Sequence, residues 1–368
     1  MRIHIVGLPH TETTHEFEWC AYTQKIRKLC GMLMDSGHVV FLYGGERNKA
    51  RCTEFVPIID RAWQAARFGT YDWSRDTFDI FDPNAEPWQT MNGRAIAEIL
   101  KRYESRDYLG ISIGVCQKQI ADAFPGVVVE TGIGYAGVFA NYRVFESHAW
   151  AHHVSGLSRS DDCRFFDTVI PNSFEAKYFP EGTGRGGYDL FVGRFIPRKG
   201  IQIAAECTGR LGLQLKIAGQ GVTRIDGDRI YGAGGFWVEG RGIEHLGVID
   251  SEERAQLMGG ARCVWVPTTY LEPFGGVAVE AMLCGTPVIT TDWGAFTETV
   301  AQGISGYRCR TLHDFLCARG LVEDMDRAAI RQYALSKYTT DVLRHEYDRY
   351  FETLNSLWSD GWYSTNPK

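Results

Sequence analysis

The chain has 368 residues, more than a single hydrophobic core usually supports, so two domains are expected. Its composition, 44% apolar and 23% charged, is that of an ordinary soluble globular protein, and no internal repeat or low-complexity segment is visible. The formal net charge of −6 gives no global attraction to nucleic acid or to an anionic membrane, although a local basic patch stays compatible with it.

Targeting and redox signals favour a reduced, cytoplasmic setting. The longest apolar runs fall well short of the roughly 20 residues that span a bilayer. Residues 1–8 are too short for the core of a signal peptide and instead predict a first strand. The ten cysteines include no Cys-x-x-Cys pair and no zinc spacing, and several, such as Cys30, Cys263 and Cys284, lie in apolar runs.

The N-terminal half opens with a strand, a helix and a strand. RIHIVG (2–7) and VVFLYGG (39–45) are the strands. Between them, apolar residues recur at helical spacing: Tyr22, Ile26, Leu29, Cys30 and Leu33. This βαβ pattern predicts a parallel sheet, with further strands at 108–113, 127–131 and 168–172. The aromatic-rich segment 60–90 is compatible with an insertion over a cleft or with a packed loop.

A Gly-rich and polar stretch at 172–187 marks a boundary, after which a second βα series begins. We predict strands at 188–193, 213–219, 263–267 and 286–291, with helices at 201–212 and 251–261. The expected domains are 1–178 and 179–338, each Rossmann-like, followed by a C-terminal helix within 339–368 that packs back toward the N-terminal domain. The predicted fold class is therefore α/β, with two doubly wound domains facing across a cleft.

The first candidate motif is VGRFIPRKG (192–200). A strand ends at Gly193, where the backbone can approach a ligand closely, and Arg194 and Lys199 emerge from the loop that follows. Two cations at the carboxyl end of a strand are suited to clamp a diphosphate, with arginine as a planar fork and lysine as a compact charge. The alternative is a solvated basic loop ahead of a helix.

The second motif is EPFGGVAVE (272–280), which follows an apolar run and leads into a helix. Gly275 and Gly276 offer backbone N–H groups at the helix N-terminus, where the helix dipole favours an anion. Glu272 precedes the helix and Glu280 lies about one turn inside it, so the two carboxylates address different parts of a ligand. Acidic residues that only complement the helix dipole are the alternative, which explains one carboxylate but not the whole spacing.

A third motif, WGAFTE (293–298), places Glu298 at the start of a helix, where a capping role is the simpler explanation. Taken with GRFIPRKG (193–200) and EPFGGVAVE (272–280), it resembles the GT-B retaining glycosyltransferases, in particular the family 4 type, also called glycosyl transferases group 1. The resemblance spans roughly 188–310. It implies a retaining hexosyltransferase with a UDP- or GDP-sugar as donor substrate, no tightly bound cofactor and no metal.

The resemblance also implies residue roles in a nucleotide-sugar-binding C-terminal domain. Arg194 and Lys199, beside Gly193, bind the diphosphate, and Glu280 binds the ribose hydroxyls. Glu272 lies at the donor sugar, together with the backbone of Phe274, Gly275 and Gly276. Glu298 joins this donor-binding set.

The N-terminal domain is the acceptor side in this family and carries a histidine near the reacting sugar. Three candidates lie in FESHAWAHHVSG (145–156): His148, His152 and His153, of which we favour His148 and then His152. The first loop, GLPHTETTHEFEW (7–19), departs from the glycine-rich form usual in the family. It supplies polar acceptor contacts, or a helix N-cap through Thr13 or Thr14.

The expected partners are a nucleotide-sugar donor and a saccharide or glycan acceptor, without a membrane span. A nucleotide-sugar 2-epimerase would share the fold and the diphosphate clamp but would act without an acceptor. A transferase acting on a modified nucleic-acid base is disfavoured by the net charge. A dinucleotide-dependent oxidoreductase fits the βαβ opening, but its first turn reads GLPHTE instead of G-x-G-x-x-G. A non-catalytic sugar-binding module would not need phosphate-binding elements.

Overall fold

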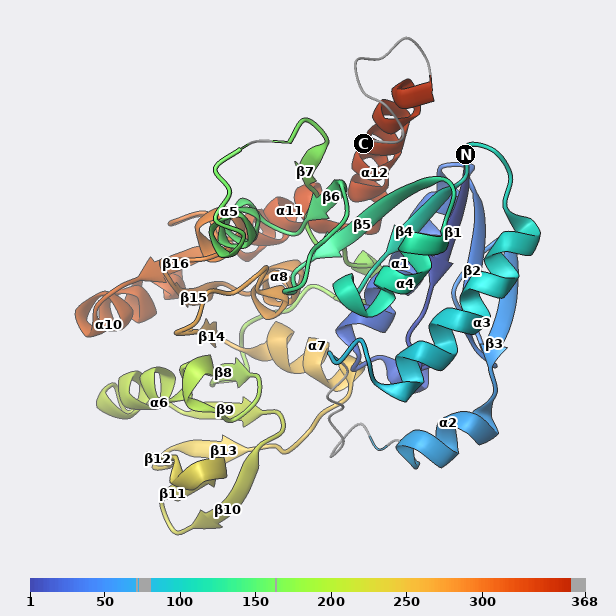
Figure 1. Cartoon of the computed structure of the whole chain (residues 1–368). Coiled ribbons are helices and arrows are strands. Elements are labelled where there is room, and N and C mark those ends of the chain that lie inside the picture. The colour runs from blue at the N-terminus through green and yellow to red at the C-terminus, as the bar shows by residue number, and fades with distance from the viewer. Residues whose placement is uncertain (71, 73–80, 163, 359–368) are drawn as a thin grey trace. The chain divides into compact units, whose positions relative to one another are not determined.

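The computed structural model describes residues 1–70, 72, 81–162 and 164–358, and its backbone divides into two compact units (Figure 1). Unit 1 comprises Met1–Ser147, Ala151–Ser173 and the chain from Thr340 onward. Unit 2 comprises His148–Trp150 and Phe174–Thr339. Each unit is built on a parallel sheet of its own. Within the described ranges, no helix has the length and apolar character needed to cross a bilayer.

Unit 1 contains a seven-stranded sheet in the order β3-β2-β1-β4-β5-β6-β7, with every neighbouring pair parallel. Its strands are β1 (Arg2–Val6), β2 (Val39–Gly45), β3 (Glu54–Ile59), β4 (Tyr108–Ile111), β5 (Val127–Ile133), β6 (Tyr142–Phe145) and β7 (Asp167–Val169). The strand order reverses between β1 and β4, which is the doubly wound arrangement. The predicted opening of strand, helix and strand is confirmed.

The helices of unit 1 are α1 (Ala21–Asp35), α2 (Arg61–Phe68), α3 (Glu86–Arg102), α4 (Lys118–Ala123), α5 (His148–Leu157) and α12 (Thr340–Asn355), and the first three residues of α5 fall in unit 2. Short 3-10 turns occur at η1 (His15–Phe17), η2 (Gly114–Gln117) and η7 (Ser356–Trp358). Of segment 60–90, the structure describes α2 and the start of α3, whereas residues 71 and 73–80 lie outside the described residues.

Alternating residues of the unit 1 strands face two different helical layers. Ile3 and Ile5 of β1 pack toward α1 and α12, whereas Val6 packs toward α3 and α4. The period of two follows from strand geometry, and sheets covered on both faces have strands that are apolar almost throughout. Helices α1 and α12 pack on one another through the apolar stripes that the sequence predicts. Thr13 donates to Asn48 and does not cap α1, whose N-cap position is Cys20.

Unit 2 contains a six-stranded parallel sheet in the order β13-β9-β8-β14-β15-β16. Its strands are β8 (Asp189–Val192), β9 (Leu215–Ala218), β13 (Ile243–His245), β14 (Val264–Val266), β15 (Val288–Thr291) and β16 (Gly306–Cys309). Its helices are α6 (Ile201–Arg210), α7 (Ser251–Gly260), α8 (Gly276–Leu283), α9 (Phe296–Thr299), α10 (Leu312–Leu321) and α11 (Arg327–Tyr338). Its 3-10 turns are η3 (Ala176–Tyr178), η4 (Pro197–Lys199), η5 (Ala233–Gly235) and η6 (Val322–Asp324). The four strands and two helices predicted for this half are all present.

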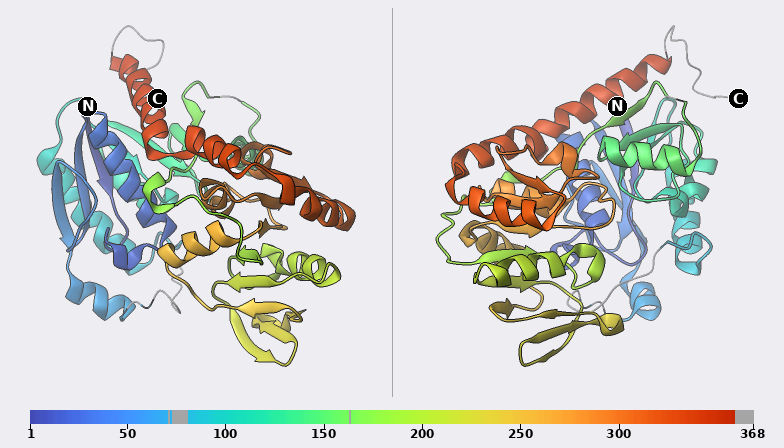
Figure 2. Two further views of the ribbon diagram at one scale, coloured as in Figure 1. Left: turned by 180° about the vertical axis from the view of Figure 1, so that it is seen from behind. Right: turned by 90° about the vertical axis from the view of Figure 1, so that its left-hand side faces the viewer.

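A small antiparallel sheet, which was not predicted from the sequence, interrupts this second series. It consists of β10 (Val222–Asp226), β11 (Arg229–Gly232) and β12 (Trp237–Glu239), inserted between β9 and β13 where a crossover helix is the usual connection (Figure 2). Gly227 and Asp228 form the two-residue loop between β10 and β11. Ile230 and Val238 are buried in the core of unit 2 and anchor the insertion.

One ion pair is fully buried beneath the unit 2 sheet. Arg319 Nε lies 2.6 Å from Asp189 Oδ2, and their side chains are only 3% and 1% exposed. Trp265 Nε1 donates to the same carboxylate oxygen at 2.9 Å. Buried charges are tolerated only when they are paired and hydrogen-bonded. The contacts of Asp189 with Arg319 and Trp265 therefore hold α10 against strands β8 and β14.

Candidate functional site

The loop after β8 brings one of its two predicted cations close to the sheet. The Gly193 N–H donates to the Ala218 carbonyl of β9 at 2.9 Å. A Cβ on Gly219, whose φ is +140°, would lie 2.1 Å from the Gly193 carbonyl oxygen, so the two loops meet through glycine. Lys199, at the end of η4, is half-buried, whereas the Arg194 side chain is exposed. Among the described residues, no salt bridge includes Arg194.

Lys199 contacts two side chains that come from the segment after β14. Its Nζ donates to Tyr270 Oη at 2.8 Å and lies 3.3 Å from Glu272 Oε2. The Arg198 guanidinium lies over the Tyr270 ring at 4.1 Å from its centroid. Burial first, and the nearby Glu272 carboxylate second, raise the pKa of Tyr270, so its hydroxyl stays protonated. The structure therefore joins the first and second motifs through a Lys199–Tyr270–Glu272 cluster.

The glycine pair forms the turn that begins α8. Gly275 has φ +80° and ψ 50°, a left-handed conformation, and occupies the N-cap position. The Ala278 N–H donates to the Gly275 carbonyl at 3.0 Å, whereas the N–H groups that precede it in a helix have no partner within that helix. Phe274 is buried against Phe174, which leaves its backbone, not its ring, for a ligand.

A small cavity of about 30 Å³ lies at this point of unit 2. The residues that line it include the predicted positions Lys199, Glu272, Gly275 and Gly276, together with Thr268. It is formed at the carboxyl ends of β8 and β14, the edge of an open α/β sheet at which ligands bind. A cation, a carboxylate and helix N-terminal amides therefore line one small cavity, and these groups are chemically suited to contact a phosphate oxygen and a hydroxyl group.

Glu280 lies one turn further along α8 and has a different partner. Arg254 of α7 approaches it with two nitrogens: Nε is 3.1 Å from Oε2 and Nη2 is 3.3 Å from Oε1. Glu280 is not among the residues that line the cavity around Lys199. The two carboxylates of EPFGGVAVE thus occupy separate places, as their spacing predicts.

Glu298 is engaged at the N-terminus of another helix. Its carboxylate accepts from the backbone N–H groups of His148 at 2.8 Å and Ala149 at 2.7 Å, the first two residues of α5. Its observed contact is therefore a cap, the simpler explanation considered for WGAFTE, but on α5 and not on its own helix α9. The predicted donor-binding role of Glu298 stays a prediction. The catalytic roles of His148, His152 and His153 also stay predictions. The side chains of His148 and His152 are exposed on α5, and His153 is half-buried.

Three features of this region escaped the sequence analysis. Gly219 and Gly221 at the end of β9 carried a readable signal, the AGQG sequence directly after a predicted strand. Tyr270, two residues before Glu272, carried none, because only the folded chain brings it to Lys199. Arg254 likewise has no local motif, and its significance comes from the contact with Glu280.

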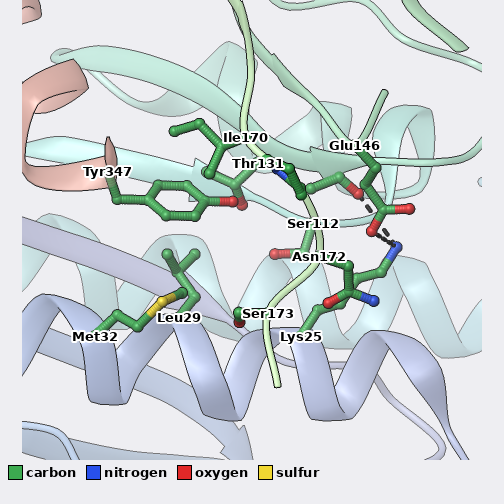
Figure 3. Close-up of a pocket in the computed structure, with 12 residues that line it drawn as sticks. Lys25, Leu29, Met32, Ser112, Thr131, Glu146, Ile170, Asn172, Ser173 and Tyr347 are labelled. Atoms are coloured by element: carbon green, nitrogen blue, oxygen red, sulfur yellow. Dashed lines mark hydrogen bonds and ion pairs between the residues drawn. The ribbon is translucent and has the colours of Figure 1, made fainter. Parts of the chain in front are cut away.

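Unit 1 has a polar cavity at the carboxyl ends of its own strands (Figure 3). Lys25 of α1 points toward Glu146, directly after β6, with Nζ 2.6 Å from Oε1. Ser112 follows β4, and Tyr347 reaches the cavity from α12. The cavity has a volume of about 20 Å³, which admits one water-sized polar group. Its partly buried donor, Lys25, and its buried acceptor, Glu146, are suited to a single hydroxyl or water.

Comparison with protein families finds that residues 188–333 match the family described as glycosyl transferases group 1. Phosphatidyl-myo-inositol mannosyltransferase of Mycobacterium leprae (strain TN) is 30% identical over 190 residues, which cover 48% of this chain and 46% of that protein. Glycogen synthase of Mycobacterium tuberculosis (strain ATCC 25618 / H37Rv) is 34% identical over 154 residues, which cover 39% and 36%. The chain spans about half the length of the curated mannosyltransferases it matches.

Solved structures resemble the whole chain. Sucrose-phosphate synthase from Thermosynechococcus elongatus matches 96% of this chain and 99% of its own, with a TM-score of 0.68 at 18% identity. AviGT4, a glycosyltransferase involved in avilamycin A biosynthesis, covers 98% of each chain with a TM-score of 0.64 at 18% identity. Anabaena Alr3699/HepE, in complex with UDP and glucose, covers 96% and 99% with a TM-score of 0.63 at 14% identity. At these identities the likeness shows the fold, which is the predicted GT-B fold.

Proposed function

Because residues 188–333 of this chain match the family described as glycosyl transferases group 1, we propose a specific reaction. The protein moves a sugar from a nucleotide-diphosphate sugar to an acceptor hydroxyl, with retention at the anomeric carbon. The donor is a UDP- or GDP-hexose, and the acceptor is a saccharide or glycan precursor. The reaction uses no metal and takes place in the cytoplasm.

The observation that carries this proposal is the convergence of Lys199, Glu272 and the Gly275 turn on one cavity in unit 2. A diphosphate is the ligand whose charge matches a lysine ammonium beside the N-terminus of a helix. The adjacent Glu272 carboxylate would be repelled by phosphate, but it is suited to accept hydrogen bonds from sugar hydroxyls. A phosphate and a sugar side by side are what a nucleotide-diphosphate sugar presents.

In the proposed reaction, the bond between the anomeric carbon and the distal phosphate oxygen breaks as the acceptor oxygen bonds to the same face of that carbon. The acceptor proton passes to the departing phosphate oxygen, so the step is balanced without a covalent enzyme intermediate. Lys199, Arg194 and the first amides of α8 stabilise the negative charge that develops on the leaving diphosphate. Glu272 orients the sugar, and His148 or His152 acts near its ring.

The donor test is a thermal-shift screen over nucleoside diphosphates and nucleotide sugars, followed by turnover with a panel of saccharide acceptors. We expect at least one nucleotide diphosphate to raise the melting temperature, and Lys199→Ala and Glu272→Gln to abolish that shift or the turnover. Stabilisation by no nucleotide, or undiminished transfer in both variants, would show the assignment to be wrong. Incubation with donor alone separates a transferase from a 2-epimerase, which would release an epimer without acceptor.

Lys216→Ala is a matched control for Lys199→Ala. Lys216 lies on β9, in the same unit, and its Nζ is 3.3 Å from Glu244 Oε2, as Lys199 Nζ is from Glu272. Both lysine side chains are 22% exposed, and Lys216 also lies over a tyrosine ring, at 4.6 Å. A loss confined to Lys199→Ala therefore reports on the site and not on the loss of a lysine ion pair.

A further inference from the structure

Glu280 is held by a two-point contact from a neighbouring helix. The Arg254 guanidinium donates a hydrogen bond from Nη2 to Oε1 at 3.3 Å and makes an ion-pair contact from Nε to Oε2 at 3.1 Å, and the two side chains are 20% and 15% exposed. Most other residues of α8 are buried and apolar, among them Val279 and Ala281 on either side of Glu280. A carboxylate on such a helix depends on a partner to offset its lost hydration.

Arg254 is itself fixed at the start of α7. Asp250 occupies the N-cap position and accepts from the Glu253 N–H at 2.8 Å, which orders the first turn of that helix. The Arg254 N–H donates to the Asp250 carbonyl at 3.0 Å, so its backbone belongs to the ordered turn. The guanidinium is therefore presented to Glu280 from a defined position, and its hydrogen bond and its ion-pair contact together restrict the orientation of the carboxylate.

The contact leaves Glu280 able to accept further hydrogen bonds. An ionised carboxylate has about four lone-pair sites, and the hydrogen bond from Arg254 Nη2 occupies one of them, on Oε1, whereas Oε2 accepts no hydrogen bond from the described residues. A ribose carries two adjacent hydroxyl groups, each of which can donate to one of the remaining sites. We propose that Arg254 is a positioning residue, which holds the Glu280 carboxylate in the orientation that binds the ribose hydroxyls of the nucleotide donor. This inference rests on the proposed function.

A purely structural role for the pair makes a different prediction. If Arg254 only joins α7 to α8, its loss weakens every nucleotide to the same extent, or affects stability alone. If it orients Glu280 for the ribose, its loss weakens a ribonucleotide more than its 2′-deoxy form, which lacks one of the two hydroxyl groups. The ratio of affinities for a ribonucleotide and its 2′-deoxy form distinguishes the two roles, because base and diphosphate are identical in both.

The experiment measures by calorimetry the Kd of UDP and GDP and of their 2′-deoxy forms. The proteins are the wild type, Arg254→Gln, Arg254→Lys and Glu280→Gln. Arg210→Gln is the control, because it removes an exposed ion pair with Glu206 in the same unit. Hydrogen bonds to charged groups predict a wild-type preference of about tenfold or more for the ribonucleotide. We expect Arg254→Gln and Glu280→Gln to reduce that preference to below about threefold, Arg254→Lys to restore part of it, and Arg210→Gln to keep it.

Three results would overturn the inference, and they are distinguishable. An unchanged ribose preference in Arg254→Gln and Arg254→Lys would leave the pair with a structural role only. A wild type that binds UDP and 2′-deoxy-UDP equally, and likewise for the guanosine forms, would exclude Glu280 as a ribose ligand while the proposed function stands. A wild type that binds none of the four nucleotides would remove the proposed function and this inference with it. Melting curves verify that each variant is folded.

Discussion

Gly275→Ala tests the turn on which the proposed donor site is built. Gly275 has φ +80°, and a non-glycine residue in the left-handed region costs roughly 1–2 kcal/mol. The added Cβ would also lie 2.4 Å from Phe296 Cε1, and Phe296 is completely buried. Displacing a core side chain in this way costs about 1–3 kcal/mol. The two effects together predict a free energy of unfolding lowered by about 2–5 kcal/mol.

Gly276→Ala is the matched control at the adjacent position. A Cβ there has Phe174 Cζ at 3.6 Å as its nearest neighbour, an ordinary van der Waals contact. Alanine is favoured over glycine inside a helix by about 1 kcal/mol, so the free energy of unfolding should stay unchanged or rise slightly. Urea unfolding followed by circular dichroism measures both variants, with a three-state fit if the two units unfold separately. A difference between the variants below about 0.5 kcal/mol would refute the left-handed turn and its contact with Phe296.

Two further predictions concern buried charges. Arg319→Met leaves Asp189 as an uncompensated buried carboxylate and should lower the free energy of unfolding by about 3–5 kcal/mol. Arg210→Met, which removes an exposed ion pair, should change it by less than about 1 kcal/mol. Equal effects of the two variants in urea titrations would argue against the buried pair. Burial raises the pKa of Glu130 to about 7, so the folded state keeps a proton that the unfolded state releases above pH 4.5, and stability falls as the pH rises from 4.5 to 7. Glu130→Gln removes this contribution, so the difference in unfolding free energy between the variant and the wild type should grow by about 2–3 kcal/mol from pH 5 to pH 7.5; a constant difference would contradict the raised pKa.

Most strands of the second unit's parallel sheet could be predicted from the sequence, because they are buried on both faces. Such strands are continuous apolar runs, and β8, β9, β14 and β15 were predicted for that reason. The motifs that we propose to bind the donor could also be recognised in the sequence, since a glycine turn before a helix and a cation after a strand are local patterns. The short strands β13 and β16 were not predicted, because each contains polar or charged residues and only three or four positions.

The inserted sheet shows a local signal that was overlooked. Gly227-Asp228 lies between the segments VTRID (222–226) and RIYG (229–232), and a two-residue loop that begins with glycine is a signal of a tight hairpin, which here joins β10 to β11. A crossover helix is the usual connection between parallel neighbours, and this chain has the three-stranded insertion in its place. The insertion follows β9 directly, so it also places Gly219 and Gly221 at its base.

The partners of the site residues could not be predicted from the sequence, because they lie far apart in the chain and meet only in the folded protein. Arg254 and Glu280 are 26 residues apart, and Glu298 caps a helix 150 residues before it in the chain. No periodicity or spacing encodes such a pairing, which depends on how helices pack on a sheet. The sequence could therefore nominate Glu280 and Glu298 but not say what holds either carboxylate.

The most direct test of the central claim is the release of nucleoside diphosphate from nucleotide sugars, measured with saccharide acceptors for the wild type, Lys199→Ala and Lys216→Ala. If Lys199 stabilises the departing diphosphate, its removal should lower kcat by roughly 100-fold or more, as expected for the loss of one electrostatic contact to a leaving group. Lys216→Ala should stay within about threefold of the wild type. Equal turnover in Lys199→Ala and Lys216→Ala, or no release from any nucleotide sugar by the wild type, would contradict a sugar-donor site at the Lys199–Tyr270–Glu272 cluster.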